Sequence, residues 1–266
     1  MAIATLDDYI GAAKQVIEWF RNETRTMVAF TPFSVFDLAG QCGGGALAGT
    51  STAAGIVPDG STVIAGYPTL NAFGGGAQGY LTRVAYQLSV AGRVRLFDRV
   101  FVAGAYAFNA NVNLASQPSF STRVPSGTDY KGLQIWIEPV TGFTGNLSVN
   151  ITYINQDGAS KSTGTFSVGV ALTVGRCVLI PLASGDTGVQ RIDNVTGSVA
   201  SAGTFNVMVL RSLWSARVLQ VGTGDAQDLF KVGAPEVFAK TAFYVLMQPD
   251  ATAPGVIELT LEVANK

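Results

Sequence analysis

Apolar and polar residues alternate with a period of two over much of the chain beyond residue 80. The alternation is clearest in residues 133–138, 147–153, 166–170, 205–209 and 257–263. A two-residue period sends successive side chains to opposite faces of a strand, as in an antiparallel sheet with one buried face. The pattern therefore predicts a mainly β protein built from half-buried strands.

Turn residues separate these segments at short intervals. Examples are Ser126-Gly127, Asp157-Gly158, Gly185-Asp186 and Pro254-Gly255. Residues 147–170 are predicted to form a hairpin folded around Asn155-Gln156-Asp157-Gly158. Many short strands with frequent turns favour an antiparallel β-sandwich of the jelly-roll kind. An immunoglobulin-like sandwich is the alternative, although its Cys…Trp…Cys spacing is absent.

The N-terminal residues instead show helical spacing. Thr5 followed by Asp8 resembles a capping box, and Lys14 and Glu18 have the spacing of a helical ion pair. We therefore expect a helix that either caps the chain's own core or docks on a neighbouring subunit. The candidate docking residues are the apolar side chains of this segment: Leu6, Tyr9, Ile10, Ala13, Val16, Ile17, Trp19 and Phe20.

Gly, Ala, Ser and Thr dominate residues 39–62, which carry little apolar surface to bury. We expect an extended, Gly-rich arm there. The glycines complete neither a phosphate-binding loop nor a dinucleotide-binding fingerprint. The predicted organisation is a helix and Gly/Ala-rich arm over residues 1–79, followed by a β-sandwich domain over residues 80–266.

The chain contains no histidine. This absence removes the Ser-His-Asp and Cys-His catalytic arrangements and every His-containing metal site. Its two cysteines, Cys42 and Cys177, are too few for a Cys-only zinc site, and Cys177 lies in an apolar run that predicts a buried free thiol. The acidic residues are scattered and form no evident catalytic pair. We predict no catalytic, cofactor-binding or metal-binding residues and no enzymatic activity.

Charged residues make up only 13% of the chain, and the formal net charge is −1. Nucleic-acid binding needs a clustered excess of Lys and Arg. Arg93, Arg95 and Arg99 surround Asp98, so we interpret them as the ion-paired rim of a strand. A weakly charged surface suits extensive protein–protein contact, because desolvating charge is costly. A secreted β protein with a neutral surface is the alternative.

No apolar stretch is long enough for a transmembrane helix, and the first residues lack the basic region of a signal peptide. We therefore expect no membrane partner and synthesis in a cytoplasm. Aromatic residues crowd positions 80–108, where core packing is the simpler interpretation and a carbohydrate-binding platform the functional one. Those rings are Tyr80, Tyr86, Phe97, Phe101, Tyr106 and Phe108.

Residues 92–100 (GRVRLFDRV) and 104–109 (GAYAFN) resemble structural proteins encoded among the head genes of tailed bacteriophages. Residues 132–138 (GLQIWIE) and 150–153 (NITY) are similar to the same group. The resemblance covers about residues 80–170. It implies a virion component, specifically a capsid decoration (cement) protein made in the bacterial cytoplasm. Its implied partners on the capsid surface are the major capsid protein and its own copies, as a trimer or dimer.

Three other functions remain open. A tail, baseplate or fibre protein would bind a host surface glycan through exposed rings. A major capsid protein would usually have a long helix and a mixed α/β core. An enzyme would need an active site built from Asp, Glu, Lys, Tyr or Ser alone.

Overall fold

A computed structural model describes residues 5–48, 51–74, 77–114, 116–170, 172–198 and 202–266. The described chain is mainly β, with antiparallel sheets and only short helices, so the predicted fold class is confirmed. Its helices are α1 (Leu6–Gly11), η1 (Ser121–Arg123), η2 (Pro125–Gly127) and α2 (Leu229–Val232). None of the helices in these ranges is long and apolar enough to cross a membrane.

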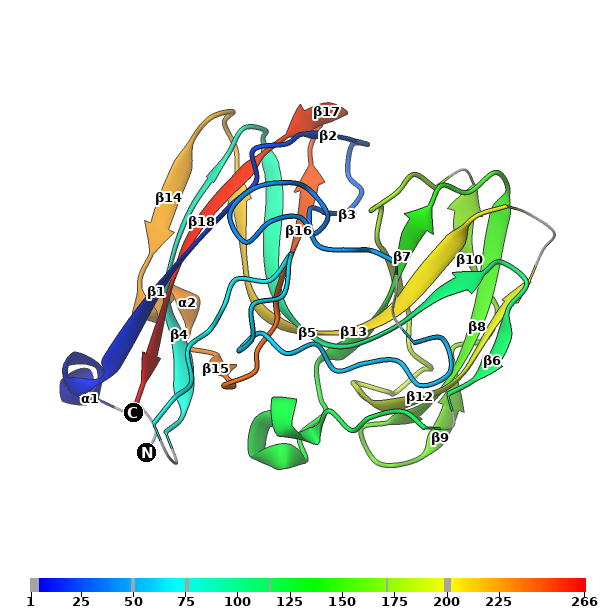
Figure 1. The fold of residues 1–266 in the computed structure, drawn as a ribbon, viewed down its shortest axis with the longest axis horizontal. Coiled ribbons are helices and arrows are strands. Elements are labelled where there is room, and N and C mark those ends of the chain that lie inside the picture. The colour runs from blue at the N-terminus through cyan, green and yellow to red at the C-terminus, as the bar shows by residue number, and fades with distance from the viewer. Residues whose placement is uncertain (1–4, 49–50, 75–76, 115, 171, 199–201) are drawn as a thin grey trace.

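Both chain ends contribute to one sheet, which we call the terminal sheet. Its strand order is β1-β18-β4-β14, and β15 also pairs with β4. The bounds are β1 (Ala13–Phe20), β18 (Ile257–Asn265), β4 (Gly79–Leu88), β14 (Gly224–Gln227) and β15 (Glu236–Val237). Beside its upper end in Figure 1, β2 (Arg25–Met27) pairs with β17 (Ala253–Gly255).

Six strands form the central sheet, in the order β11-β7-β13-β5-β16-β3. Its bounds are β11 (Val178–Ile180), β7 (Leu133–Thr141), β13 (Thr204–Val218), β5 (Gly92–Ala107), β16 (Phe243–Pro249) and β3 (Phe33–Ser34). A distal sheet follows the order β10-β8-β12-β6, with β9 also paired to β8. Its bounds are β10 (Phe166–Val170), β8 (Asn146–Asn155), β12 (Val189–Ser198), β6 (Asn111–Asn113) and β9 (Ser160–Ser162).

The long strands β5 and β13 belong to both halves of the molecule. They sweep in an arc between the terminal and distal sheets (Figure 1). One core cluster joins Val94 and Leu96 of β5 to the terminal sheet, and a second joins Val100 and Phe101 to the distal sheet. Three register shifts interrupt the β5–β13 ladder. Since a bulge bends a strand and increases its twist, these irregularities allow one pair of strands to serve two sandwiches.

The predicted strand segments are confirmed. The alternating segments fall within β7, β8, β10, β13 and β18. The predicted hairpin is also present, because β8 pairs with both β9 and β10. One detail differs: Trp136 and Glu138, on the face of β7 expected to meet solvent, are buried. A third core cluster covers this face and includes Phe36, Leu47 and Trp136.

The prediction of one N-terminal helix is wrong beyond residue 11. Helix α1 ends at Gly11, and residues 13–20 form β1, paired with β18 from Ala13↔Asn265 to Phe20↔Glu258. Within this strand Ile17 and Trp19 point into the core, while Val16 and Phe20 are exposed. Apolar residues at consecutive positions satisfy both a helical and a two-residue period, and pairing with β18 decides between them.

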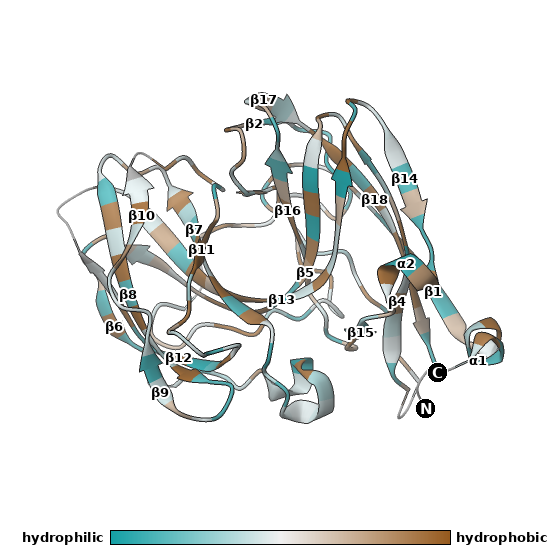
Figure 2. Cartoon of the chain, turned by 180° about the vertical axis from the view of Figure 1, so that it is seen from behind, coloured by the Kyte–Doolittle hydropathy of each residue, from teal (hydrophilic) through white to brown (hydrophobic). Residues whose placement is uncertain are grey.

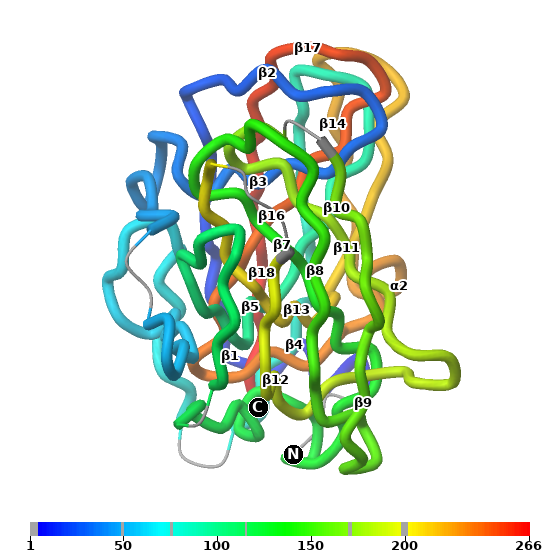
Figure 3. The backbone as a smooth tube through the Cα atoms, turned by 90° about the vertical axis from the view of Figure 1, so that its right-hand side faces the viewer, coloured from blue at the N-terminus to red at the C-terminus, as the bar shows by residue number. Residues whose placement is uncertain are grey.

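The described part of residues 39–62 forms no strand of its own but is fixed to the central sheet. Ile56 exchanges two backbone hydrogen bonds with Val102 of β5, at 2.8 and 3.0 Å. Figure 3 shows this blue-to-cyan part of the chain along one side of the molecule. Leu70 shares the first core cluster with Leu81. Residues on both sides of the proposed boundary at 79 and 80 thus share a core, and the boundary itself stays a prediction.

Candidate functional site

Helix α1 is attached to the end of β18. The expected capping box is present, with the Asp8 amide donating to Thr5 Oγ1 at 3.1 Å and the Thr5 amide donating to Asp8 Oδ2 at 3.0 Å. The Tyr9 hydroxyl donates to Glu262 Oε1 at 2.8 Å, and this bond raises the pKa of Tyr9. Lys266 forms an ion pair with Asp8. These contacts hold the helix against its own chain.

The structure separates the eight predicted docking residues into two groups. Ile17 and Trp19 belong to the core and cannot contact another subunit in the folded chain. Leu6, Ile10, Val16 and Phe20 are exposed by 62%, 64%, 65% and 38%; Tyr9 is half-buried and Ala13 exposed. A docking role stays a prediction, and it can concern only the residues that reach the surface.

One edge of β1 is open over a short stretch. The other edge pairs with β18. The stretch ends where the Gln41 amide donates to the Phe20 carbonyl at 3.0 Å. The Gln15 side chain, on the face of β1 that carries Ile17 and Trp19, bonds both the amide and carbonyl of Asn71. Because strand backbone groups alternate in direction, those of Val16 and Glu18 face the same way as the Phe20 carbonyl. No described residue hydrogen-bonds them.

A hollow of about 270 Å³ lies beside this open edge. Its lining includes Val16, Glu18, Cys42, Val63 and Ile64. Val63 is 92% exposed, so its apolar side chain is covered by nothing in the described chain. The open edge and the hollow together form a surface with unpaired backbone groups and apolar walls, which we call the β1 edge.

Other large apolar side chains are exposed elsewhere. Val28 and Phe30 lie between β2 and β3, Leu219 and Val221 lie between β13 and β14, and Phe230 lies on α2. In Figure 2, brown marks hydrophobic residues on α1 and α2. Single exposed apolar residues are normal, but grouped ones mark contact surfaces. At the β1 edge, exposed apolar side chains lie beside the open backbone groups of a strand.

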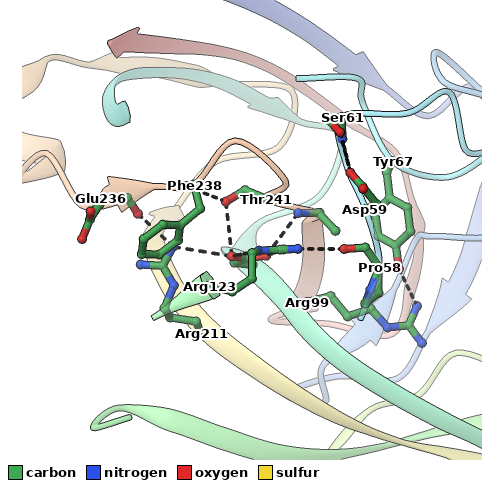
Figure 4. A network of polar contacts seen from close by, with 12 residues as sticks. Pro58, Asp59, Ser61, Tyr67, Arg99, Arg123, Arg211, Glu236, Phe238 and Thr241 are labelled. Carbon is green, nitrogen blue, oxygen red and sulfur yellow. Dashed lines mark hydrogen bonds and ion pairs between the residues drawn. The ribbon is translucent and has the colours of Figure 1, made fainter. Parts of the chain in front are cut away.

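A group of charged residues is buried at the middle of the central sheet. Asp98 of β5 is inaccessible to solvent. It forms ion pairs with Arg123 of η1 and with Arg211 of β13, the latter at 3.5 Å. The Thr241 hydroxyl and the Ala242 amide also donate to its carboxylate, at 3.2 and 3.1 Å. Figure 4 shows Arg123, Arg211 and Thr241 converging from separate elements. Each carboxylate oxygen is satisfied, as a buried charge requires.

A second buried carboxylate, Glu138 of β7, lies nearby. It accepts hydrogen bonds from Tyr244 at 2.5 Å, Arg99 at 3.2 Å and Asn206 at 3.3 Å. The Arg99 guanidinium also donates to the Tyr67 hydroxyl at 3.2 Å. These charges are sealed from solvent and paired with one another, so they are suited to bracing the sheet and not to binding a substrate.

The interpretation of the arginine cluster as a strand rim is wrong for its central members. Asp98 and Arg99 are buried, and their ionic partners come from other elements. Arg93 remains exposed and Arg95 is half-buried. The rim interpretation fails because loops cover both faces of β5 at this point, so a charged residue there must find its partner inside.

The aromatic residues of positions 80–108 are mostly core residues. Five of the six rings are buried, and Tyr80 is half-buried. A carbohydrate platform made of these rings is therefore ruled out. The described chain also contains no group of three or more Cys, Asp or Glu side chains that could hold a metal ion.

Both cysteines are free. Cys177 is buried, as predicted, and burial raises its thiol pKa well above the usual value. Cys42 is half-buried beside the β1 edge, and burial raises its pKa as well. A thiol with a raised pKa is a poor nucleophile, so neither cysteine is activated.

No family model matches this sequence, and no curated protein matches it either. Among solved structures, one of the infectious bursal disease virus Gt strain is 11% identical, with a TM-score of 0.19 over 95% of this chain and 81% of that one. The VP2 subviral particle of the same virus is 10% identical, with a TM-score of 0.16 over 95% and 80%. Likeness at this level does not establish a shared fold.

Proposed function

We propose that this chain is a non-enzymatic structural protein of a virion that acts through contacts between protein subunits. The observation that carries the proposal is the apolar surface grouped around the β1 edge, where Val16, Val63 and Ile64 lie beside unpaired strand backbone. An open strand edge with apolar neighbours is a template for pairing with another chain. The low content of charged residues also supports extensive protein–protein contact, because little charge has to be desolvated.

The buried ion pairs support a rigid, load-carrying subunit. Asp98 and Glu138 link β5 and β7 to β13, β16 and loops far apart in the sequence. Both oxygens of the Asp98 carboxylate have partners, and paired buried charges hold the elements around them in one arrangement. A subunit in a lattice benefits from such a fixed shape, because its contact surfaces must keep their relative positions.

The finer assignment is a capsid decoration protein of a tailed bacteriophage. It rests on the resemblance of residues 92–100, 104–109, 132–138 and 150–153 to phage head proteins. The partners would be the major capsid protein and further copies of this chain. A tail or fibre protein that binds a glycan is less well supported, because the rings expected to form its platform are core residues.

Quantitative mass spectrometry of purified virions, combined with cryo-electron microscopy, tests the proposal. Many copies per particle, located on the outer face of the capsid, are expected. A small number of copies confined to the tail would contradict decoration but keep a structural role. Absence from the purified particle would refute the virion assignment altogether.

A further inference from the structure

We propose that two copies of this chain pair through their β1 edges in antiparallel fashion, centred on Val16, and so join two terminal sheets into one. The inference rests on the proposed assembly function, for which it names one contact surface. The partner is a second copy because the sequence of β1 is complementary to itself, as a two-fold interface requires.

The backbone groups of β1 fit an antiparallel pairing with a second copy. A two-fold axis through Val16 places Val16 opposite Val16 of the second copy, and Lys14 opposite Glu18. The backbone groups of these three residues face the open edge, by alternation from the Phe20 carbonyl that already points there. In an antiparallel ladder such residues exchange both of their hydrogen bonds with the residue opposite. The pairing ends at Phe20, whose carbonyl is occupied by Gln41.

Charge selects this register. Lys14 and Glu18 are both exposed and lie on the same face of β1 as Val16. No described residue forms an ion pair with either, and the Lys14 ammonium lies over the Tyr9 ring, 4.3 Å from its centroid. Centring on Val16 forms two Lys–Glu pairs across the two-fold axis. Centring on Glu18 or Lys14 would set like charges opposite each other, which is destabilising.

The apolar surroundings favour the same arrangement. Val16 is 65% exposed in the single chain, and pairing covers it with its own symmetry mate. Val63 and Ile64 line the hollow beside the edge and would cover the incoming strand. Apolar area and backbone hydrogen bonds thus become buried together. The symmetry is two-fold, so this contact predicts a dimer and not a trimer.

A charge-swap experiment tests the pairing in the purified full-length protein. Sedimentation velocity is measured for the wild type, Lys14→Glu, Glu18→Lys and the double variant, at concentrations up to about 100 μM, which detects micromolar dissociation constants. Lys161→Glu is the matched control, because Lys161 is exposed on β9 in the distal sheet. Circular dichroism confirms that each variant is folded.

We expect a wild-type dimer that each single substitution weakens by about tenfold or more, since two attractive pairs become repulsive at once. The double variant restores dimerisation, and Lys161→Glu leaves it unchanged. A monomeric wild type, or a dimer that is insensitive to both single substitutions, overturns the pairing. Either result is independent of whether the protein is found in virions, so the two proposals fail separately.

Discussion

Replacing Asp98 by Ala tests whether the buried ion pairs brace the central sheet. The substitution removes the carboxylate that accepts from Arg123, Arg211, Thr241 and the Ala242 amide. Arg123 is 1% exposed and Arg211 is 8% exposed, so water cannot readily replace the missing partner. Two buried positive charges would then lie close together without a counter-charge.

The expected cost follows from that geometry. Breaking a buried ion pair by removing one partner costs about 3–5 kcal/mol. For a chain of this size each kcal/mol lowers the melting temperature by roughly 2–4 °C, so a fall of about 10 °C is expected. Asp250→Ala is the control, because its partner Arg217 is 54% exposed in the side chain and such surface pairs contribute about 0–1 kcal/mol.

Differential scanning calorimetry at pH 7 compares the two variants with the wild type. Thr241→Val provides a milder perturbation if Asp98→Ala does not fold, because it removes one donor to the same carboxylate and should cost about 1 kcal/mol. If Asp98→Ala lowered the melting temperature no more than Asp250→Ala does, the argument that this network stabilises the fold would be refuted.

Three further predictions concern titration and reactivity. Burial, followed by the hydrogen bond to Asp186, raises the pKa of Tyr153 to about 12, from 10.0. The stability this gives is present below pH 10 and is lost as the pH rises toward 12. Tyr153→Phe should therefore weaken the pH dependence of the free energy of unfolding between these two values, as measured by denaturant unfolding. Ellman's reagent should label Cys42 before Cys177, which should react only on unfolding; equal rates would contradict the assigned burial. Because the chain has no histidine, dimerisation should show no sharp transition between about pH 5.5 and 8, and sedimentation across that range checks this.

The strand pattern of residues 147–153 and 257–263 could be predicted because each of these two strands buries one face against a core. Alternation is a local signal, and in the structure of β8 and β18 buried residues alternate with partly or fully exposed ones. The hairpin after Asn155 carries its own turn residues, so sequence neighbours specify it. In these segments local pattern and tertiary contacts agree.

Residues 13–20 could not be assigned correctly from their own pattern. Val16, Ile17, Trp19 and Phe20 fit a helical face as well as they fit a strand. The deciding contact is with residues 258–265, almost the whole chain length away. A pairing of such high sequence separation leaves no mark on the local sequence, which is why the helix was expected to continue.

The buried charges were missed for a related reason, although one signal was present. Trp136 shares a face of β7 with Glu138, and a large apolar ring on a face expected to meet solvent indicates that something covers it. Loop residues such as Phe36 and Leu47 provide the cover. No local rule connects these loops to β7, so the partners of Glu138 could not be named from the sequence.

The buried charges and the β1 edge have different consequences for assembly. The buried charges near Asp98 form ion pairs within the chain and therefore contribute shape, not attachment. No described residue pairs with the β1 edge, and this edge lies on a strand whose other edge and inner face are fixed by β18 and by Trp19. A rigid strand with an open edge loses little conformational entropy on pairing. The part of the N-terminal segment that the core holds in place is thus the part best prepared to bind a second copy.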